Sequence, residues 1–531
     1  MLSLQDNLSV QYLIELYHKH VADHLTKKNK KIGITAAVVA TLVYYIHDRI
    51  FKPPKELRHI PYQTYYSFVG SILRQESLWE SYRRKILPVM DDKDNDGIYV
   101  RPFDGAWNVM VSNPAHVKKI LLNTAMLNGS AWKAQRKLTN PAFHRAMPVN
   151  LFGDLTLELF QVIDQANGSV NFTELITRWT LESIGKAGFG IVFCREEKNM
   201  MSFTYTSSWL GFEFNAISQK DSKWVKTYTV INSGLSNPIH FLFPFLDRYD
   251  SIWLSAKRRY LHHQMDLFLE MIDQVILKKR TAIERGDSEN NFLPEHEKDL
   301  LTLMIEGEMR GEGVMSDEEL RSNVCLFFLA GHETTSSALS FAIYRLAVNP
   351  DIQQRAREEA IRVLGDEPKD ALPTLDQTKQ FPYINQIIKE VLRIDCPVNR
   401  VIPRQTSEDF FFNNTLIPKG SLVCVDLTAI HHSKKVWSDP EKFDPDRFAE
   451  GGEASLHDAG SGMTWLPFSM GGRQCAGMKM SLYQQRIFLA MLLRKYTWKL
   501  PENSIHKNGT VQKGTFTISP VKMEIEFTKR Y

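Results

Sequence analysis

One cysteine of this sequence stands in a loop whose neighbours suit it to bind a metal. Residues 468–477 read FSMGGRQCAG, and Cys475 is the only cysteine in this stretch. The thiolate is the form of cysteine that binds metals, and its charge is stabilised by backbone N–H groups or by a helix N-terminus. Backbone amides could approach the sulfur closely because the loop contains glycines, namely Gly471, Gly472 and Gly477.

Other residues of this loop suit a metal-containing cofactor that itself supplies most of the atoms that coordinate the metal. We expect a long helix from Ala476 to about Tyr496, whose N-terminus would face Cys475. Arg473 is a cation suited to a carboxylate of a bound group, and Phe468 could cover the sulfur and exclude water. No second cysteine or histidine lies nearby, so a single thiolate suits an iron whose other positions are filled by haem.

A second set of polar residues interrupts an apolar helical pattern. Ser316 and Glu319 form a capping box, and the next helix breaker is Asn349-Pro350. The intervening helix of about 33 residues would be roughly 50 Å long, enough to cross a domain. Its middle, FFLAGHETTSSALSF at 327–341, contains a glycine, a carboxylate and two threonines. Buried polar groups of this kind need partners or water.

The chemistry of this helix has two interpretations. Gly331 permits close backbone approach, and a threonine hydroxyl turned on the main chain loosens the helix, so we expect a bulge near Thr334. The other interpretation is a kinked core helix whose polar groups are satisfied. A zinc-protease site is excluded by spacing, because Ser336 stands where the HExxH motif needs its second histidine.

Composition narrows the class of protein. The chain has 531 residues and a net charge of +4, which gives no reason to expect nucleic acid as a partner. Its five cysteines are widely spread and form no CxxC pair. They therefore suggest neither a disulfide framework nor a zinc knuckle, and favour a reducing compartment.

The N-terminal region differs from the rest. Residues 32–46 carry no charge and are flanked by basic residues on both sides, which leaves the orientation open. As a helix they span roughly 22 Å, short of a ~30 Å hydrocarbon core unless flanking side chains snorkel. We interpret 32–50 as a transmembrane anchor, with a buried core helix as the alternative. Residues 1–31 precede it and include an interfacial helix at 11–25, and a proline-containing linker follows at 51–62.

The remainder predicts one large domain over 63–531. Strand-like runs such as GIYVRPF and WNVMVS precede the helical NPAHVKKILLN, and residues 150–350 are mostly helical in pattern. We expect a surface loop at 279–298. After residue 395 extended segments return, with turns at Asn413-Asn414 and Lys419-Gly420. The fold class is thus mainly α with small peripheral β-sheets.

Five ordered motifs resemble those of the cytochrome P-450 family, in its eukaryotic microsomal form. The pattern around Cys475 is similar to the family's haem-thiolate signature. AGHETT at 330–335 resembles the oxygen-activating segment of its central helix. EVLR at 390–393 and FDPDRF at 443–448 resemble its ExxR motif and the segment that pairs with it, and WKAQR at 132–136 resembles its WxxxR helix. The resemblance extends from about Pro53 to the end of the chain.

The resemblance implies a fold and a set of site residues. Its fold is a helix-rich prism around a buried haem b, with Cys475 as axial ligand to the iron within the motif of Phe468, Gly471 and Gly477. The haem propionates would be held by one tryptophan and three arginines, namely Trp132, Arg136, Arg404 and Arg473. A structural ion-pair triad behind the haem would consist of Glu390, Arg393 and Arg447.

The resemblance also implies an activity. In the segment from Ala330 through Gly331, Thr334 would hold dioxygen and a water while Glu333 relays protons. One oxygen atom would enter a hydrophobic small molecule, with electrons from NADPH delivered by a separate flavoprotein reductase. Such a partner could dock on a basic face, composed of Lys133, Lys137, Lys479 and Arg486, although a plain solvated face is the alternative. The resemblance places the anchor in the endoplasmic reticulum membrane and the catalytic domain in the cytosol.

Two other classes remain open, and two features, at Ser469 and in the region 120–131, depart from the family's pattern. The protein could be a haem-thiolate enzyme that rearranges peroxides, or a catalytically inactive haem-binding membrane protein. Ser469 replaces a usual glycine, which is tolerable if its φ is negative. The region 120–131 is short, and we hypothesise a gene model that lacks an exon. The aromatic-rich stretch 203–253 suits a lid or access channel, or else plain core.

Overall fold

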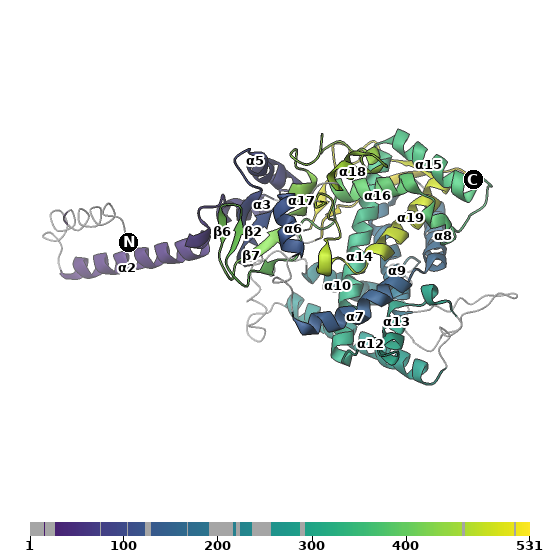
Figure 1. The fold of residues 1–531 in the computed structure, drawn as a ribbon, viewed down its shortest axis with the longest axis horizontal. Helices are drawn as coiled ribbons and strands as arrows, with labels where there is room; N and C mark the ends of the chain where they lie inside the picture. Colours follow the sequence, from purple (N-terminus) through teal and green to yellow (C-terminus); the bar gives the residue numbers. More distant parts are fainter. Residues whose placement is uncertain are drawn as a thin grey trace.

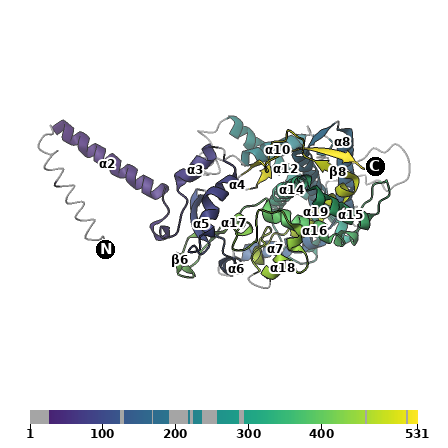
Figure 2. The same cartoon turned by 90° about the horizontal axis from the view of Figure 1, so that it is seen from above.

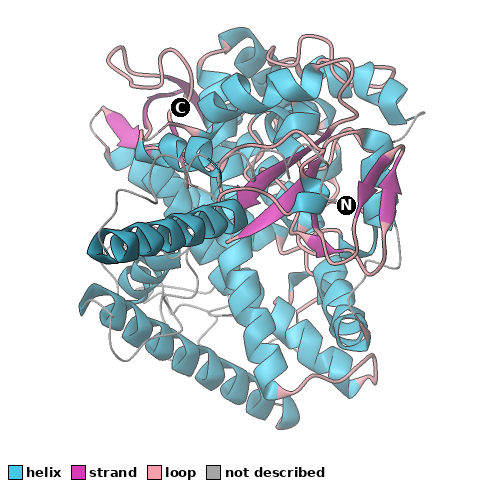
Figure 3. Ribbon diagram, turned by 90° about the vertical axis from the view of Figure 1, so that its left-hand side faces the viewer, coloured by secondary structure: helices cyan, strands magenta, loops and turns pink. Residues whose placement is uncertain are grey.

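A computed structural model describes most of the chain. The described residues are 15, 27–74, 76–103, 105–122, 129–166, 168–190, 216–218, 223–235, 256–286, 293–458, 462–514 and 517–531. Helices form a thick body, and one long N-terminal helix projects from it (Figures 1 and 2). Some strands lie at the side of the body nearest that helix (Figure 3), and others lie close to the C-terminus at the far side (Figure 2). The mainly helical fold with small sheets predicted from sequence is therefore confirmed.

The helices are distributed along the whole described chain. Those of the N-terminal half are α2 Lys27–Ile50, α3 Tyr65–Leu73, α4 Leu78–Ser81, α5 Leu87–Asp91, α6 Pro114–Leu122, α7 Ser130–Arg145, α8 Val149–Gln165, α9 Phe172–Phe189 and α10 Lys223–Leu235. Those that follow are α12 Ala256–Glu284, α13 Leu300–Met309, α14 Asp317–Ala347, α15 Pro350–Leu364, α16 Pro382–Ile394, α17 Leu427–His431, α18 Glu453–Asp458 and α19 Met478–Lys495.

The largest described sheet has the strand order β1-β2-β7-β4, with bounds β1 Ile98–Phe103, β2 Ala106–Val111, β7 Leu422–Val425 and β4 Arg404–Gln405. Strands β2 and β7 pair in parallel, and the other pairs are antiparallel. A second sheet has the order β3-β11-β8, formed by β3 Ser169–Asn171, β11 Glu524–Lys529 and β8 Tyr496–Lys499. Two short pairs complete the set, β5 Phe410–Phe412 with β6 Thr415–Ile417, and β9 Gln512–Lys513 with β10 Ser519–Pro520. The extended segments predicted at both ends of the domain are thus present.

Helix α14 runs through the centre of the body (Figure 1). It begins after Ser316, whose side chain and that of Glu319 form the predicted capping box. It remains α-helical throughout Asp317–Ala347, so the bulge expected near Thr334 is not present. The Thr334 hydroxyl bonds the carbonyl of Ala330, 2.9 Å away, without interrupting the helix. A single i to i−4 side-chain bond is therefore compatible with a regular helix here.

Helix α14 packs most closely against α9. A Cβ atom added at Gly331 would lie 2.9 Å from Cδ1 of Ile184 on α9, which is closer than side-chain packing permits. Gly331 therefore lets the two helices pack closely here, and a larger residue would force the Ile184 side chain to shift.

The predicted loop at 279–298 is wrong for its first residues. Helix α12 continues to Glu284, and Lys279 is buried with its Nζ 2.6 Å from Oδ2 of Asp299. A run of charges on the sequence suggested solvent exposure, but this lysine is neutralised by a carboxylate that precedes the next helix. Residues 287–292 lie outside the described ranges.

The projecting helix α2 has exposed apolar side chains along its length, among them Ile34, Val38 and Leu42, so the alternative of a buried core helix is wrong. Within the described ranges, no helix combines the length and the apolar character needed to cross a membrane. The linker that follows packs on the domain, because Leu57 and Ile60 are buried. The interfacial helix expected at 11–25 falls outside the described residues, apart from residue 15.

Candidate functional site

Cys475 lies three residues before the start of α19, and its side chain is exposed. Burial raises the pKa of the thiol, whereas the N–H groups of Gly477 and Met478 and the charge of Arg136 lower it. The amides that stabilise a thiolate here are those at the first turn of α19, as the helix N-terminus predicted.

Gly471 has a different role in the loop from the predicted one. Gly471 adopts a φ of +74°, and a Cβ atom there would lie 2.7 Å from the carbonyl oxygen of Leu121. It therefore lets the loop approach the end of α6, and no contact shows its amide directed at the sulfur. Phe468 is half-buried, and its carbonyl accepts a 2.9 Å hydrogen bond from the Cys475 amide.

Ser469 does not meet the condition under which it would replace glycine easily. Its φ is +58°, in the left-handed region that favours glycine. Its buried hydroxyl oxygen has no hydrogen-bond partner in the described part of the chain. This residue is therefore a strained position within the cysteine loop.

The arginines predicted around the cysteine are brought together by the fold. Arg136 on α7 donates to the carbonyl of Gln474, next to Cys475. Arg473 lies over the indole ring of Trp132, also on α7, at 3.9 Å from its centre. Arg404 on β4 donates to the Ile120 carbonyl at 2.6 Å, one residue from the carbonyl that Gly471 approaches.

These arginines have no negatively charged partner among the residues that the structure describes. None forms an ion pair with a described residue, and each keeps one buried nitrogen without a hydrogen-bond partner, namely Nε of Arg136, Nη2 of Arg404 and Nη2 of Arg473. Burial lowers the pKa of all three guanidinium groups; Arg473 lowers that of Arg404 further, and Arg136 that of Arg473. Arg404 is buried and Arg136 and Arg473 are half-buried, and cations that repel one another in such a place favour an anionic ligand. The two propionates of a haem are such anions, so the residues fit that group.

A row of side chains at i, i+4 spacing lies at the surface of α14. Leu326 and Ala330 are exposed, and Thr334 continues the same i, i+4 row. The hydroxyl of Thr335 lies 3.1 Å from that of Ser481 on α19, which connects the middle of α14 to the helix that follows Cys475. A mainly apolar face with one hydroxyl suits a hydrophobic ligand.

Glu333 borders this row. It is half-buried, and its carboxylate makes no hydrogen bond or ion pair with any residue that the structure describes. A carboxylate without a protein partner in such a place can bind water and exchange protons with it.

The three residues of the predicted triad are adjacent. Glu390 and Arg393 on α16 are fully buried and pair at 2.7 Å, and Nε of Arg447 lies 3.5 Å from the same carboxylate. Sequence reasoning missed Glu453, which pairs with Arg447, and His431, whose Nε2 accepts from the Leu466 amide at 3.0 Å. No motif identified these two, because each depends on where a loop folds back.

This triad is connected to the cysteine loop. Arg393 donates to the carbonyl of His431 at 2.7 Å, and the His431 ring in turn bonds Leu466, just before the loop. The Trp465 indole donates to the Lys389 carbonyl at 3.0 Å. The buried ion pairs therefore hold the segment that leads into residues 468–477.

The basic docking face is only partly formed by the predicted residues. Lys133, Lys137 and Lys479 are exposed. Arg486 is half-buried and donates to the carbonyls of Leu482 and Thr378, at 3.1 and 3.3 Å, so it is not available as a surface cation. Residues 123–128 of the short region and most of 203–253 lie outside the described ranges.

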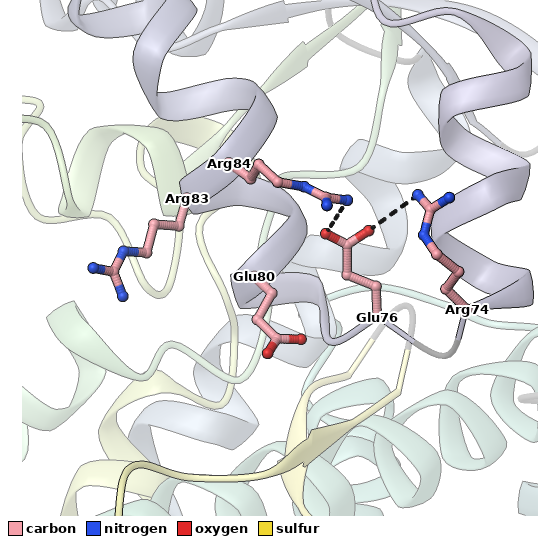
Figure 4. Close-up of a pocket in the computed structure, with 5 residues that line it drawn as sticks. All are labelled: Arg74, Glu76, Glu80, Arg83 and Arg84. Carbon is pink, nitrogen blue, oxygen red and sulfur yellow. Dashed lines mark ion pairs between the residues drawn. The ribbon is translucent and has the colours of Figure 1, made fainter.

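A charged depression lies elsewhere on the molecule (Figure 4). Its volume is ≈ 630 Å³, and it is lined by residues after α3 and near α4, namely Arg74, Glu76, Glu80, Arg83 and Arg84. Glu76 pairs with Arg84 at 2.6 Å and with Arg74 at 3.8 Å. None of the predicted site residues lines this depression.

A mainly helical fold, a cysteine just before a helix N-terminus and an arginine cluster without counter-ions among the described residues are together consistent with a haem-thiolate protein. The sequence model of the cytochrome P-450 family matches residues 107–527, and the chain belongs to that family. It is therefore an oxidoreductase whose cofactor is a haem with a cysteine thiolate on the iron.

Relatives agree with this assignment. Cytochrome P-450 4A11 of Homo sapiens is 28% identical over 381 residues, covering 70% of this chain and 67% of the relative. Cytochrome P-450 4A10 of Mus musculus is 28% identical over 379 residues, covering 70% and 68%. Cytochrome P-450 3A5 of Homo sapiens is 26% identical over 440 residues, covering 80% and 79%.

Proposed function

We propose that this monooxygenase receives electrons from a separate NADPH-dependent flavoprotein reductase and oxidises a hydrophobic small molecule. The observation that carries the site assignment is the cluster of Arg136, Arg404 and Arg473 beside Cys475. Each of these arginines has a buried nitrogen without a partner in the described chain. Such a cluster suits a ligand with two carboxylates whose centre lies next to a thiol.

The chain's own residues then have defined roles toward the cofactor. Cys475 supplies the thiolate, and the amides of Gly477 and Met478 stabilise its charge. Arg136, Arg404 and Arg473 bind the propionates, with Trp132 holding the Arg473 plane in position. Bound in this way, haem supplies reductive activation of O₂, which thiolate donation favours.

The residues of α14 provide proton transfer and a dry surface. The Thr334 hydroxyl can exchange its bond to the Ala330 carbonyl for one to a water molecule. Glu333 can hold a proton from water and pass it on, because its carboxylate has no partner among the described residues. Leu326 and Ala330 present an apolar surface that binds a hydrophobic substrate and excludes water.

The cellular location that we propose for the protein is based on helix α2 and on the state of the cysteines. The exposed apolar side chains of α2 support attachment to a bilayer, for which we propose the endoplasmic reticulum membrane with the catalytic domain in the cytosol. The cysteines of the described chain are free thiols, which is consistent with a reducing compartment. Exposed Lys133, Lys137 and Lys479 support a docking site for an acidic reductase surface.

The decisive experiment is a carbon-monoxide difference spectrum of the reduced protein. We expect a thiolate-type band in wild type and in Cys325→Ser, which removes a different half-buried thiol, and no such band in Cys475→Ala. An unchanged band in Cys475→Ala would refute the ligand assignment. Turnover that requires both NADPH and reductase excludes the peroxide-rearranging enzyme, and any product at all excludes the inactive binding protein.

A further inference from the structure

The charged depression of Figure 4 lies where the chain turns from α3 into α4. Glu76 lies between Arg84 and Arg74 in this view, and its side chain is only 9% exposed. Its carboxylate pairs with Arg84 at 2.6 Å, and its other oxygen lies 3.8 Å from Arg74 and 3.6 Å from Nζ of Lys85. Three cations therefore converge on one carboxylate.

The second carboxylate of the depression is already engaged by the protein. Oε2 of Glu80 accepts from the backbone N–H and the hydroxyl of Ser77, at 3.1 and 3.0 Å. Among the residues that the structure describes, the Arg83 side chain has no hydrogen bond or ion pair, and that of Arg74 has only the long contact with Glu76. Four cations and two carboxylates thus meet here, which leaves an excess of positive charge at the surface.

The backbone fixes the place of these arginines. Residues Tyr82–Ile86 form a π-helical turn, a rare conformation that is frequent at functional sites. Arg83 and Arg84 are neighbours in this turn. Lys85 of the same turn donates to the Ser67 carbonyl of α3 at 3.0 Å, which joins the turn to that helix. The two sides of the depression are therefore held at a set separation by contacts of the protein itself.

The depression lies on the side of the body from which α2 projects, since α3 and α4 are both found on that side (Figure 2). At the base of α2, Phe51 stacks on Tyr66 of α3 with 5.0 Å between ring centres, and Tyr66 is 59% exposed. An exposed tyrosine beside an apolar helix is typical of a membrane interface. The nine residues of α3 rise about 13 Å, so the arginines at its far end lie roughly that distance from the base of α2.

We propose that Arg74, Arg83 and Arg84 bind the phosphate monoester of an anionic phospholipid headgroup, for which phosphatidic acid is the simplest probe. Arginine presents a planar set of donors that binds phosphate through paired hydrogen bonds, and a monoester offers three oxygens as acceptors. An excess of positive charge next to a bilayer attracts anionic lipids. This inference rests on the membrane attachment proposed above for α2, to which it adds a lipid-specific contact of the catalytic domain.

The test measures how tightly the haem-loaded, full-length protein binds vesicles at constant ionic strength. The vesicles consist of phosphatidylcholine alone, of phosphatidylcholine with phosphatidic acid, or of phosphatidylcholine with phosphatidylserine at the same surface charge. Attachment through α2 should give binding to all of them. We expect wild type to bind the phosphatidic acid vesicles about tenfold or more tightly than the phosphatidylserine vesicles, because a matched charge without the monoester lacks the paired hydrogen bonds.

A double variant tests the site without disturbing its core. Arg74→Gln with Arg83→Gln retains the pair of Arg84 and Glu76, and we expect it to bind the two kinds of anionic vesicle almost equally. Arg310→Gln with Arg362→Gln is the matched control: it removes the same charge from side chains that are 40% and 68% exposed, after α13 and on α15, away from α2 (Figure 1). The control should keep the wild-type preference.

The thiolate-type carbon-monoxide band checks that both double variants are folded. Equal binding of the two anionic vesicles by wild type would overturn the proposal. An equal loss of preference in the control would overturn it as well, because net charge and not this site would then be responsible.

Amide hydrogen exchange locates the contact and identifies the source of the phosphate. Phosphatidic acid vesicles, compared with phosphatidylcholine vesicles, should slow exchange at 82–86 by about fivefold or more in wild type and not in the variant without Arg74 and Arg83. Unchanged exchange there would overturn the proposal. If inorganic phosphate alone slows exchange at 82–86 as strongly as the vesicles do, the ligand is a soluble phosphate and the lipid assignment is wrong.

Failure of the membrane attachment would be seen separately. A wild-type protein that does not bind phosphatidylcholine vesicles lacks the attachment proposed for α2, whereas the preference for phosphatidic acid and the exchange at 82–86 still decide on this site.

Discussion

The guanidinium carbon of Arg473 lies 3.9 Å from the centre of the Trp132 ring, so α7 is stacked directly on the loop that carries Cys475. A guanidinium held over an indole is attracted by the ring and fixed in its plane. The WxxxR motif therefore does two things at once: Arg136 bonds the cysteine loop, and Trp132 orients a second cation next to it.

Removal of this stacking should weaken haem retention. A cation over an aromatic ring contributes about 0.5–2 kcal/mol, so we expect Trp132→Ala to release haem roughly 3- to 30-fold faster. Trp132→Phe retains an aromatic face, so its rate of haem release should lie between those of wild type and Trp132→Ala. Transfer of haem to an excess of an apoglobin acceptor measures the rate; equal rates for wild type and Trp132→Ala would contradict the role of the ring.

The buried triad should respond far more strongly to substitution than an exposed ion pair. Glu390→Gln leaves the fully buried Arg393 without its carboxylate, at an expected loss of about 3–5 kcal/mol in the free energy of unfolding. Arg355 and Asp446 form a pair with both side chains 54% exposed, so Asp446→Asn should cost less than about 1 kcal/mol. Denaturant unfolding of the two variants checks the contrast, and comparable losses would argue against it.

Gly331 should be intolerant of a methyl group for a packing reason. Gly331→Ala places a Cβ 2.9 Å from Cδ1 and 3.2 Å from Cγ1 of Ile184, and overpacking of this kind typically costs about 1–3 kcal/mol. Ile184→Val removes Cδ1. When it is combined with Gly331→Ala, part of the lost stability should be recovered. Thermal unfolding of the single and double variants measures both, and absence of recovery would indicate a cause other than this contact.

His332 should make the folded protein sensitive to acid. Its pKa in the folded state is about 3, below the ordinary 6.5, so the unfolded chain binds a proton that the folded chain does not. The stability it contributes is complete above pH 6.5 and is lost as the pH falls toward 3. Between these values wild type should lose about 1.4 kcal/mol per pH unit more than His332→Gln. Urea unfolding at a series of pH values compares the slopes; parallel slopes would contradict the prediction.

Ser469 should be more stable as glycine. Its φ of +58° is costly for any residue with a Cβ, and we expect Ser469→Gly to raise the free energy of unfolding by about 1 kcal/mol. Ser469→Ala removes only the unpartnered hydroxyl and keeps the strained φ. If Ser469→Ala stabilises the protein as much as glycine does, then the hydroxyl and not the backbone is responsible.

Several features of the fold could be predicted because they depend on near neighbours in the sequence. The capping box of Ser316 and Glu319, the strands β1 and β2, and the helix after Cys475 each follow from short patterns of polar and apolar residues. Predictions based on exposure were less successful. Lys279 was expected in a surface loop, but its partner Asp299 lies twenty residues further on and buries it.

The sequence by itself determined the family, the mainly helical class and the residue types of the site. Motif spacing and local patterns of polar and apolar residues can be recognised without knowing which distant residues are in contact. Only the tertiary structure decided which cations lack counter-ions, which glycine is needed for helix packing, and that Tyr228 bonds His332 across 104 positions of the chain. Those properties depend on which groups lie together in the interior. There, water cannot compensate for an unpaired charge or a missing hydrogen bond.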